Sequence, residues 1–283
     1  MASAAPLAAV GLGLMAATLW GSSDFTGGLG ARRAPALLLV AAGHLVTLLL
    51  LGTICLWARV PFPPLRAALL GGIAGLEGAL SLAIFYRALA EGAMGATAAV
   101  TGVLTAVVPV GFALWSQGWP RGTEVAGLAL GATAIALTAW QREPEASRRA
   151  VALGALAGVG FGIQLVLLKL AAEGGVAWAM TTARAGGLLG VGLVLASRAS
   201  GGKRVPRSGY WRMGVLAGVL DATGNGAYML AAEMGRMEVG AMIASLYPAV
   251  TIALAALLLR ERPTRRQRLG IGVALAAIVL LSQ

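Results

Sequence analysis

Residues 35–57 read PALLLVAAGHLVTLLLLGTICLW, a run of 23 residues without Asp, Glu, Lys or Arg. A helix of this length measures about 35 Å, enough to cross the roughly 30 Å hydrocarbon core of a bilayer. Comparable apolar stretches recur along the whole chain, at 7–28, 35–57, 66–88, 94–116, 122–140, 150–170, 176–196, 211–232, 238–259 and 267–282. The sequence therefore predicts an all-α integral membrane protein with ten transmembrane helices.

The composition supports the same class. Of 283 residues, 58% are apolar and only 12% are charged, and the mean hydropathy is +0.83. Soluble domains carry about 25% charged residues, and collagen needs a glycine at every third position, which the 41 glycines do not follow. A single cysteine, Cys55, and a single histidine, His44, exclude an intramolecular disulfide and Cys-rich or His-rich metal clusters. We expect no cofactor.

The net charge of +11 reflects membrane topology, because the basic residues fall between the apolar stretches. The connections between spans 1–2, 3–4, 5–6, 7–8 and 9–10 hold about 16 Lys and Arg, and the other connections hold about five. The positive-inside rule places the basic connections in the cytoplasm and both termini outside, so lipid head groups are expected partners and nucleic acid is not. Usage of Arg far above Lys, with abundant Ala and Gly, is typical of a GC-rich bacterial genome and suggests the inner membrane.

The most polar break lies at the middle of the chain and divides the ten spans into five and five. The predicted organisation is a first five-helix repeat at 1–140, a polar linker at 141–149 and a second repeat at 150–283. Laying 95–140 over 238–283 matches Pro120 with Pro263 and Gly127 with Gly270. Because five is odd, the repeats must insert in opposite directions, which is the inverted-repeat architecture of many secondary transporters.

Ionisable residues inside the spans are the main candidates for a site, because each costs roughly 2.5–3.5 kcal/mol to insert at the bilayer centre. On the eighth span Asp221, Asn225 and Tyr228 follow the spacing i, i+4, i+7 and so share one helical face. On the third span Glu77 and Ser81 repeat the i, i+4 spacing, and a shift of 144 residues carries this pair onto Asp221 and Asn225. We infer a polar stripe in each repeat that faces a cavity.

Other polar and aromatic residues complete the predicted cavity. Trp20 and Asp24 share a face of the first span, and His44 of the second span corresponds loosely to Arg184 of the seventh. Trp178 is either a wall of the cavity or an interfacial anchor, and Arg184 could instead pair with Asp24 or Asp221 as a structural salt bridge. The predicted substrate-binding residues are Trp20, Asp24, His44, Glu77, Ser81, Arg184, Asp221, Asn225, Tyr228 and Tyr247.

Glycine and proline add expectations about packing. Spacings of Gly-x3-Gly permit close approach of helices, and they occur at Gly71 and Gly75, Gly127 and Gly131, Gly154 and Gly158, Gly186 and Gly190, and Gly214 and Gly218. Pro109 and Pro248 lie within the fourth and ninth spans, where each is expected to free backbone carbonyls and kink the helix.

Several motifs, taken in order, resemble a known family. They are Trp20-Gly21-Ser22-Ser23, the Pro109 and Pro248 spans, and Leu259-Arg260-Glu261-Arg262-Pro263 followed by Gly270. The chain resembles the EamA-like, ten-helix branch of the drug/metabolite transporter superfamily over essentially its whole length. The first half departs from the pattern, with Gln117-Gly118-Trp119-Pro120 where the second has Arg260 to Pro263. The resemblance implies transport without catalysis and a basic residue, usually Arg, near the place of Arg184.

The function predicted from these features is secondary transport of a small polar or amphipathic metabolite, such as an amino acid or amine, most simply as an exporter working by alternating access. Coupling to protons through Glu77 or Asp221 is a further hypothesis. A passive channel or lipid scramblase is the alternative. An integral-membrane enzyme is disfavoured, because the sequence shows no compact nucleophile and base and no acidic cluster for a metal.

Overall fold

The structure, a computed structural model, describes residues 4–91, 94–120, 122–139, 148–199, 210–234, 237–258 and 264–281. All regular secondary structure within these ranges is helical. The helices are α1 (Ala4–Ala31), α2 (Ala36–Trp57), α3 (Leu65–Glu91), α4 (Met94–Gln117), α5 (Gly122–Ala139), α6 (Arg148–Ala172), α7 (Val176–Ala199), α8 (Tyr210–Met234), α9 (Met237–Ala244), α10 (Tyr247–Leu258) and α11 (Arg265–Leu281).

Length and hydropathy identify five candidate membrane spans among the described residues. These are Ala36–Trp57, Leu65–Glu91, Arg149–Ala172, Val176–Ser197 and Val239–Leu258, and two shorter apolar helices cover Val100–Ser116 and Val125–Leu137. Large apolar side chains lie open on the outer surface, for example Leu49 (61% exposed), Leu257 (76%) and Trp57 (87%). Hydrocarbon accepts such a surface, whereas water would not. The all-α membrane class is therefore confirmed, and ten spans stays a prediction.

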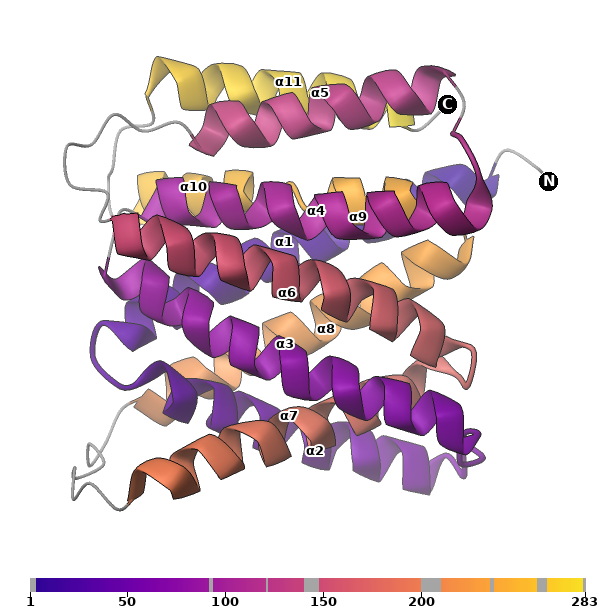
Figure 1. Cartoon of the computed structure of the whole chain (residues 1–283), viewed down its shortest axis with the longest axis vertical. Coiled ribbons are helices and arrows are strands. Elements are labelled where there is room, and N and C mark those ends of the chain that lie inside the picture. The colour runs from indigo at the N-terminus through magenta and orange to yellow at the C-terminus, as the bar shows by residue number, and fades with distance from the viewer. Residues whose placement is uncertain are drawn as a thin grey trace.

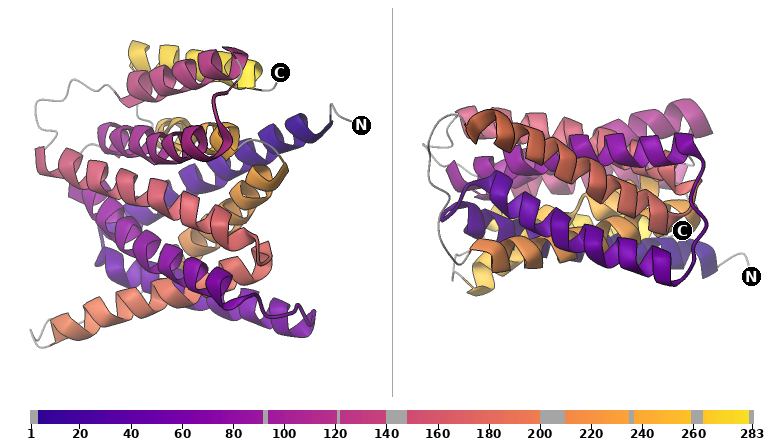
Figure 2. Two further views of the ribbon diagram at one scale, coloured as in Figure 1. Left: turned by 45° about the vertical axis from the view of Figure 1, so that its right-hand side comes forward. Right: turned by 90° about the horizontal axis from the view of Figure 1, so that it is seen from below.

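The helices lie in layers along the longest dimension of the molecule (Figure 1). An outer layer of α5 and α11 covers α4, α9 and α10, the next layers hold α1, α6, α8 and α3, and α2 and α7 form the far side (Figures 1 and 2). The most extensive contacts join helices from opposite halves of the sequence: α1 with α8, α3 with α6 and α7, α4 with α6, and α5 with α11. The core is thus shared between the two halves.

Glycines make the closest helix crossings possible, as the Gly-x3-Gly spacings predicted. The Gly43 and Gly218 backbones meet where α2 crosses α8, and a Cβ on Gly43 would lie 2.7 Å from the Gly218 Cα. A Cβ on Gly75 would overlap the Ala183 backbone of α7, and one on Gly186 would overlap Gly72 of α3. Only residues without a Cβ allow these backbones to touch, which strengthens van der Waals packing where lipid supplies no hydrophobic driving force.

The ninth predicted span, 238–259, consists of two helices rather than one. It is divided into α9 and α10 by a turn at Ser245 and Leu246, immediately before Tyr247 and Pro248. Pro248 has no N–H and cannot continue the hydrogen-bond ladder, and where a kink was predicted the structure has two separate helices. The corresponding proline of the first half, Pro109, lies inside α4, which is assigned as one helix throughout. The two prolines therefore have different local structures.

Candidate functional site

A chain of polar side chains connects three helices inside the bundle. Trp20 on α1 donates its Nε1 hydrogen to Asn225 Oδ1 at 3.0 Å, and Asn225 Nδ2 lies 3.4 Å from Asp221 Oδ2, one helical turn earlier on α8. The same carboxylate oxygen accepts a hydrogen bond of 2.6 Å from Arg184 Nη1 on α7. Two of the three residues predicted to share a face of α8, Asp221 and Asn225, therefore contact each other as their i, i+4 spacing predicts, and they lie between α1 and α7.

The ion pair between Arg184 and Asp221 is deeply placed. The Arg184 side chain is 2% exposed and the Asp221 side chain 16%. Of the two carboxylates that the sequence offered as partners, the structure selects Asp221. Arg184 Nε is buried without a hydrogen-bond partner. His44 lies close enough to Arg184 for the two side chains to interact electrostatically. The His44 Nδ1 atom, however, lies 3.1 Å from the Val40 carbonyl oxygen of its own helix. His44 thus has a local hydrogen bond, and Arg184 keeps an unused donor.

The second predicted pair lies on α3. Ser81 donates a hydrogen bond of 2.6 Å to Glu77 Oε1, while Glu77 Oε2 is buried without a partner. Both side chains face α6, since a Cβ built on Gly160 would meet the Ser81 hydroxyl and the Glu77 carboxylate. Gln164, one turn further along α6, lies against Gly78. The shift of 144 residues relates two pairs, Glu77 with Ser81 and Asp221 with Asn225. In each pair the two side chains contact each other within their own helix, and the pair faces a helix of the other half of the chain.

A small cavity of about 30 Å³ lies between the two halves, with room for one or two water molecules. Its lining is Trp20, Asp24, Leu82, Thr105, Phe161, Gln164, Leu165, Asp221, Asn225 and Tyr247, from α1, α3, α4, α6, α8 and α10. Five predicted site residues are in this lining. The other five, His44, Glu77, Ser81, Arg184 and Tyr228, lie outside it. In this conformation the cavity is too small for a whole metabolite.

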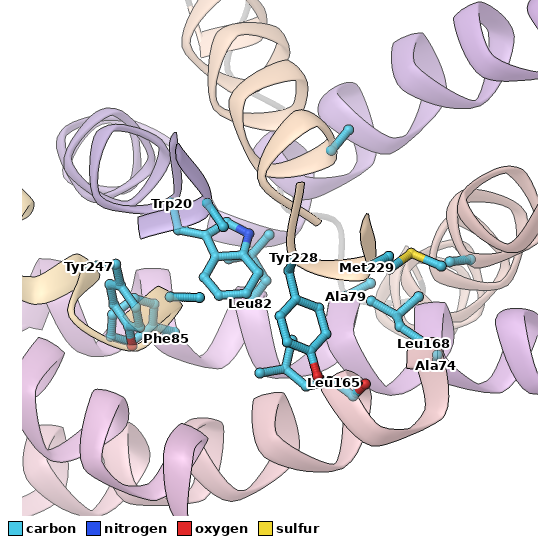
Figure 3. Close-up of a cluster of buried hydrophobic side chains, with 14 of the residues drawn as sticks. Trp20, Ala74, Ala79, Leu82, Phe85, Leu165, Leu168, Tyr228, Met229 and Tyr247 are labelled. Atoms are coloured by element: carbon cyan, nitrogen blue, oxygen red, sulfur yellow. Dashed lines mark hydrogen bonds between the residues drawn. The ribbon is translucent and has the colours of Figure 1, made fainter. Parts of the chain in front are cut away.

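Trp20, Phe85, Tyr228 and Tyr247 belong to one cluster of buried side chains (Figure 3), and Trp20 and Tyr247 also line the cavity. The Trp20 ring centroid lies 6.0 Å from that of Tyr228 and 6.4 Å from that of Tyr247, the latter edge to face at 86°. Tyr247 also packs edge to face on Phe85, at 6.5 Å. The Tyr228 hydroxyl donates to the Leu165 carbonyl at 3.4 Å, so Tyr228 supports the wall from behind. The break before Pro248 places Tyr247 at the start of α10, beside this cluster.

Trp178 does not belong to the cavity, and its interpretation as a wall is wrong. Its Nε1 donates to the Val60 carbonyl at 2.9 Å, and its ring packs on Phe62 with centroids 4.9 Å apart. Both partners lie between α2 and α3, near the start of α7. The alternative, an anchor near the end of a span, fits this position because an indole combines an apolar ring with one donor.

Several polar residues inside the bundle were not predicted from the sequence. Gln164 and Thr105 line the cavity, and Tyr86 on α3 is 1% exposed. The Ser23 hydroxyl donates to the Ala217 carbonyl at 2.9 Å, so the 3.2 Å contact with Tyr86 requires the Tyr86 hydroxyl to donate to Ser23. Gln164 could have been found, because it lies 144 residues after Trp20 and so has the same offset as the two acidic pairs.

A wider pocket of about 550 Å³ lies elsewhere on the molecule. It is bounded by the start of α2, the last turns of α3 and Val194 of α7, and Arg87 and Glu91 stand in its lining. Arg87 Nε donates to Glu91 Oε1 at 2.7 Å, and Arg149 of α6 lies 3.9 Å from Glu91 Oε2. Leu82, in the wall of the central cavity, and Ala83, in the wall of this pocket, are consecutive on α3. The two spaces therefore both border α3 at this point.

Comparison with known proteins agrees with this architecture. The model of the EamA-like transporter family matches residues 148–283, from the start of α6 onward. This half is an EamA-like transporter domain. The EamA-like family belongs to the drug/metabolite transporter superfamily, so the resemblance drawn from the sequence is confirmed. An EamA-like domain together with several apolar helices long enough to span a bilayer makes the chain a multi-pass membrane protein of the transporter class.

The fold is also found in solved structures. One crystal structure, described only as that of a protein, is 18% identical, covers 96% of this chain and 95% of the other, and superposes with a TM-score of 0.71. At this identity the likeness shows the fold alone. No curated protein matches the sequence. The motif from Leu259 to Pro263 and the linker residues 141–147 lie outside the described residues.

Proposed function

We propose that this EamA-like protein is a secondary transporter, working as an exporter, that moves a small polar or amphipathic metabolite such as an amino acid or amine by alternating access. The single observation behind the proposal is the hydrogen-bonded chain of Trp20, Asn225, Asp221 and Arg184 beside a small cavity between the two halves, which Trp20, Asn225 and Asp221 line. Buried ionisable groups in a membrane bundle are expensive to insert and are characteristic of substrate and ion pathways.

Two inverted repeats, 1–140 and 150–283 with a linker at 141–149, supply the mechanical basis of this proposal. The five helices of the first half correspond in order to those of the second: α1 to α6, α2 to α7, α3 to α8, α4 to α9 and α10 together, and α5 to α11. When each helix is replaced by its counterpart, the main helix contacts are exchanged for one another. The contact of α1 with α8 becomes that of α6 with α3, and α2 with α8 becomes α7 with α3. In Figure 1, α1 and α6 run in opposite directions across the bundle. This pattern supports ten spans in which α9 and α10 together form the ninth.

Alternating access requires a site that opens first to one side and then to the other. The central cavity holds only about 30 Å³, whereas the 550 Å³ pocket lies beside the connection with Arg32 and Arg33, on the face that the basic connections assign to the cytoplasm. We infer that substrate reaches the central cavity past α3 from this pocket, and that rocking of one half against the other then opens the opposite side. The Gly contacts at α3, α7, α2 and α8 are flat surfaces along which such sliding meets few side chains.

Transport is tested with purified protein in proteoliposomes under an imposed pH gradient, with a pooled metabolite mixture read by mass spectrometry. We expect accumulation against a concentration gradient, and we expect it to be abolished by Glu77→Gln combined with Asp221→Asn. Glu77→Gln alone keeps an oxygen for the Ser81 hydroxyl, so it removes the charge with little change in shape. The matched control is Glu173→Gln, which removes an exposed carboxylate at the end of α6.

Three outcomes are informative. If the double variant accumulates substrate with unchanged pH dependence, the coupling role of these acids is wrong. Flux that is selective but only downhill would identify a uniporter, a channel or, with lipid as cargo, a scramblase. Loss of transport in Glu173→Gln would show that the assay reports general damage. Size-exclusion chromatography of each variant shows whether it is folded.

Orientation is part of the proposal and has its own test. We propose a bacterial inner-membrane protein with both termini outside, because the connections after spans 1, 3, 5, 7 and 9 are rich in arginine. Cys55, the only cysteine, is buried, so a Cys55→Ser background allows single exposed cysteines at Arg33 and Ala58. A membrane-impermeant maleimide added to intact cells should label the cysteine at position 58 and spare the one at 33. The reverse pattern would invert the proposed topology and place the 550 Å³ pocket on the outer side of the membrane.

A further inference from the structure

Asp24 differs from the other carboxylates of the bundle. It lies on α1, its residue is 6% exposed, and it stands in the wall of the central cavity. Asp221 has Arg184 as a partner and Glu77 has Ser81. For Asp24, no hydrogen bond or ion pair occurs among the described parts of the chain. A carboxylate so deeply buried loses its hydration, and without a compensating partner this is costly.

The charges around the cavity leave Asp24 uncompensated. The lining of the central cavity contains two carboxylates, Asp24 and Asp221, which are near enough to repel each other. Within the part of the chain that the structure describes, the cation paired with either acid is Arg184, which is bound to Asp221. The cavity therefore holds one negative charge more than positive charge when both acids are ionised. A single monovalent cation would balance it.

The other lining groups favour an organic cation. Trp20 shares the face of α1 with Asp24, and Tyr247 lies edge to face against the Trp20 ring. Aromatic faces attract ammonium groups, most strongly when water is excluded. Hard metal cations instead need about six oxygen ligands. Among the lining oxygens, Asp221 Oδ2 is already bound to Arg184 and Asn225 Oδ1 already accepts the Trp20 indole hydrogen. The wall is thus better suited to an ammonium group than to a bare metal ion.

We propose that Asp24 is the cation-recognising residue of this transporter and that its substrates carry an ammonium group, which binds between the Asp24 carboxylate and the Trp20 and Tyr247 rings. The inference rests on the proposed transport function. The cavity of about 30 Å³ holds only the head group. The body of the substrate occupies the cavity once it has opened. Arg184, already paired with Asp221, stabilises the site and leaves Asp24 free for the substrate.

The test is binding of three probes of similar shape to the full-length protein in nanodiscs, measured by calorimetry: benzylammonium, benzyl alcohol and benzoate. We expect benzylammonium to bind at least tenfold more tightly than the other two. Asp24→Asn should weaken benzylammonium about tenfold or more, because a contact to a charged group contributes about 1.5–3 kcal/mol. Asp24→Glu should retain binding, and Glu173→Gln is the charge-matched control on the surface.

Each result supports or overturns the proposal. Equal binding of benzylammonium and benzyl alcohol, or unchanged binding in Asp24→Asn, overturns it. Tighter binding of benzoate would assign the site to an anion and to the unused Arg184 donor. Competition by sodium alone would make Asp24 a metal-ion ligand and also overturn it. Because Asp24→Asn removes an unpaired buried charge, it should melt at the same or a higher temperature, which shows that the variant is folded.

Failure of this inference and failure of transport give different results. Transport of neutral or anionic metabolites in proteoliposomes, with no preference for amines, would leave the transporter intact and remove the ammonium class. Binding of benzylammonium that depends on Asp24, without any flux, would leave the cation site and remove transport.

Discussion

Replacing Arg184 with methionine is expected to lower the stability of the protein by about 3–5 kcal/mol, the usual cost of leaving one member of a buried ion pair alone. The Asp221 carboxylate would lose its 2.6 Å bond to Arg184 Nη1, and only the longer contact from Asn225 would remain. The measurement is the midpoint of thermal unfolding in detergent, followed by the fraction that stays monodisperse on size exclusion. An unchanged midpoint would show that Asp221 is satisfied without Arg184.

The double variant Arg184→Met and Asp221→Leu separates a structural salt bridge from a functional one. With both charges gone, neither Arg184 nor Asp221 leaves its partner as an unpaired buried ion, so we expect stability to return close to that of the wild type. If the pair only holds α7 against α8, transport should return as well. If the pair shapes the cavity, the double variant should fold and fail to transport. The second result is expected, since Asp221 lines the cavity and Asn225, which binds Trp20, depends on it.

The largest packing effect is expected at Gly75, where α3 crosses α7. A methyl group at this position would overlap the backbone of Ala183, and a backbone cannot move aside as a flexible side chain does. Gly75→Ala should therefore push the helices apart and cost at least the 1–3 kcal/mol usual for overpacking, with loss of transport. The measurements are the unfolding midpoint and the initial transport rate.

The matched control is Gly72→Ala, one turn earlier on the same helix. A Cβ at Gly72 meets nothing within 4 Å. Because alanine favours a helix over glycine by about 0.5–1 kcal/mol, this variant should be as stable as the wild type or slightly more stable. Equal behaviour of the two alanine variants would contradict the close crossing of α3 and α7.

Much of the candidate site followed from helical geometry alone. The spacing of four residues predicts that Asp221 lies beside Asn225 and that Ser81 lies beside Glu77, and both contacts occur. These predictions succeed because the pitch of an α-helix is fixed, so residues at i and i+4 meet whatever the rest of the fold does. The apolar runs and the EamA-like pattern likewise follow from local sequence, and the family match confirms them.

Contacts between different helices could not be predicted from residue spacing within one helix. The sequence left Asp24 and Asp221 as equal partners for Arg184, and only the crossing of α7 with α8 selects Asp221. It gave Trp178 two interpretations, and the position of Val60 and Phe62 decides for the anchor. Gln164 was not predicted to be a site residue, because a neutral amide within an apolar span costs much less to insert into the bilayer than a charged side chain does. Its place is set by α6 packing against α3.

The sequence by itself determined that this chain is a bundle of apolar helices with rare charges inside it, because insertion into a bilayer depends on composition and length over each span. The tertiary structure decided which of these charged side chains have partners. Arg184 binds Asp221, the Ser81 hydroxyl donates to Glu77, and Asp24 is left in the wall of a small cavity beside Trp20 and Tyr247. The reason is that pairing depends on the rotation and crossing of helices distant in sequence. Here backbone contacts at Gly43, Gly75 and Gly186 fix those crossings to within the width of a single methyl group.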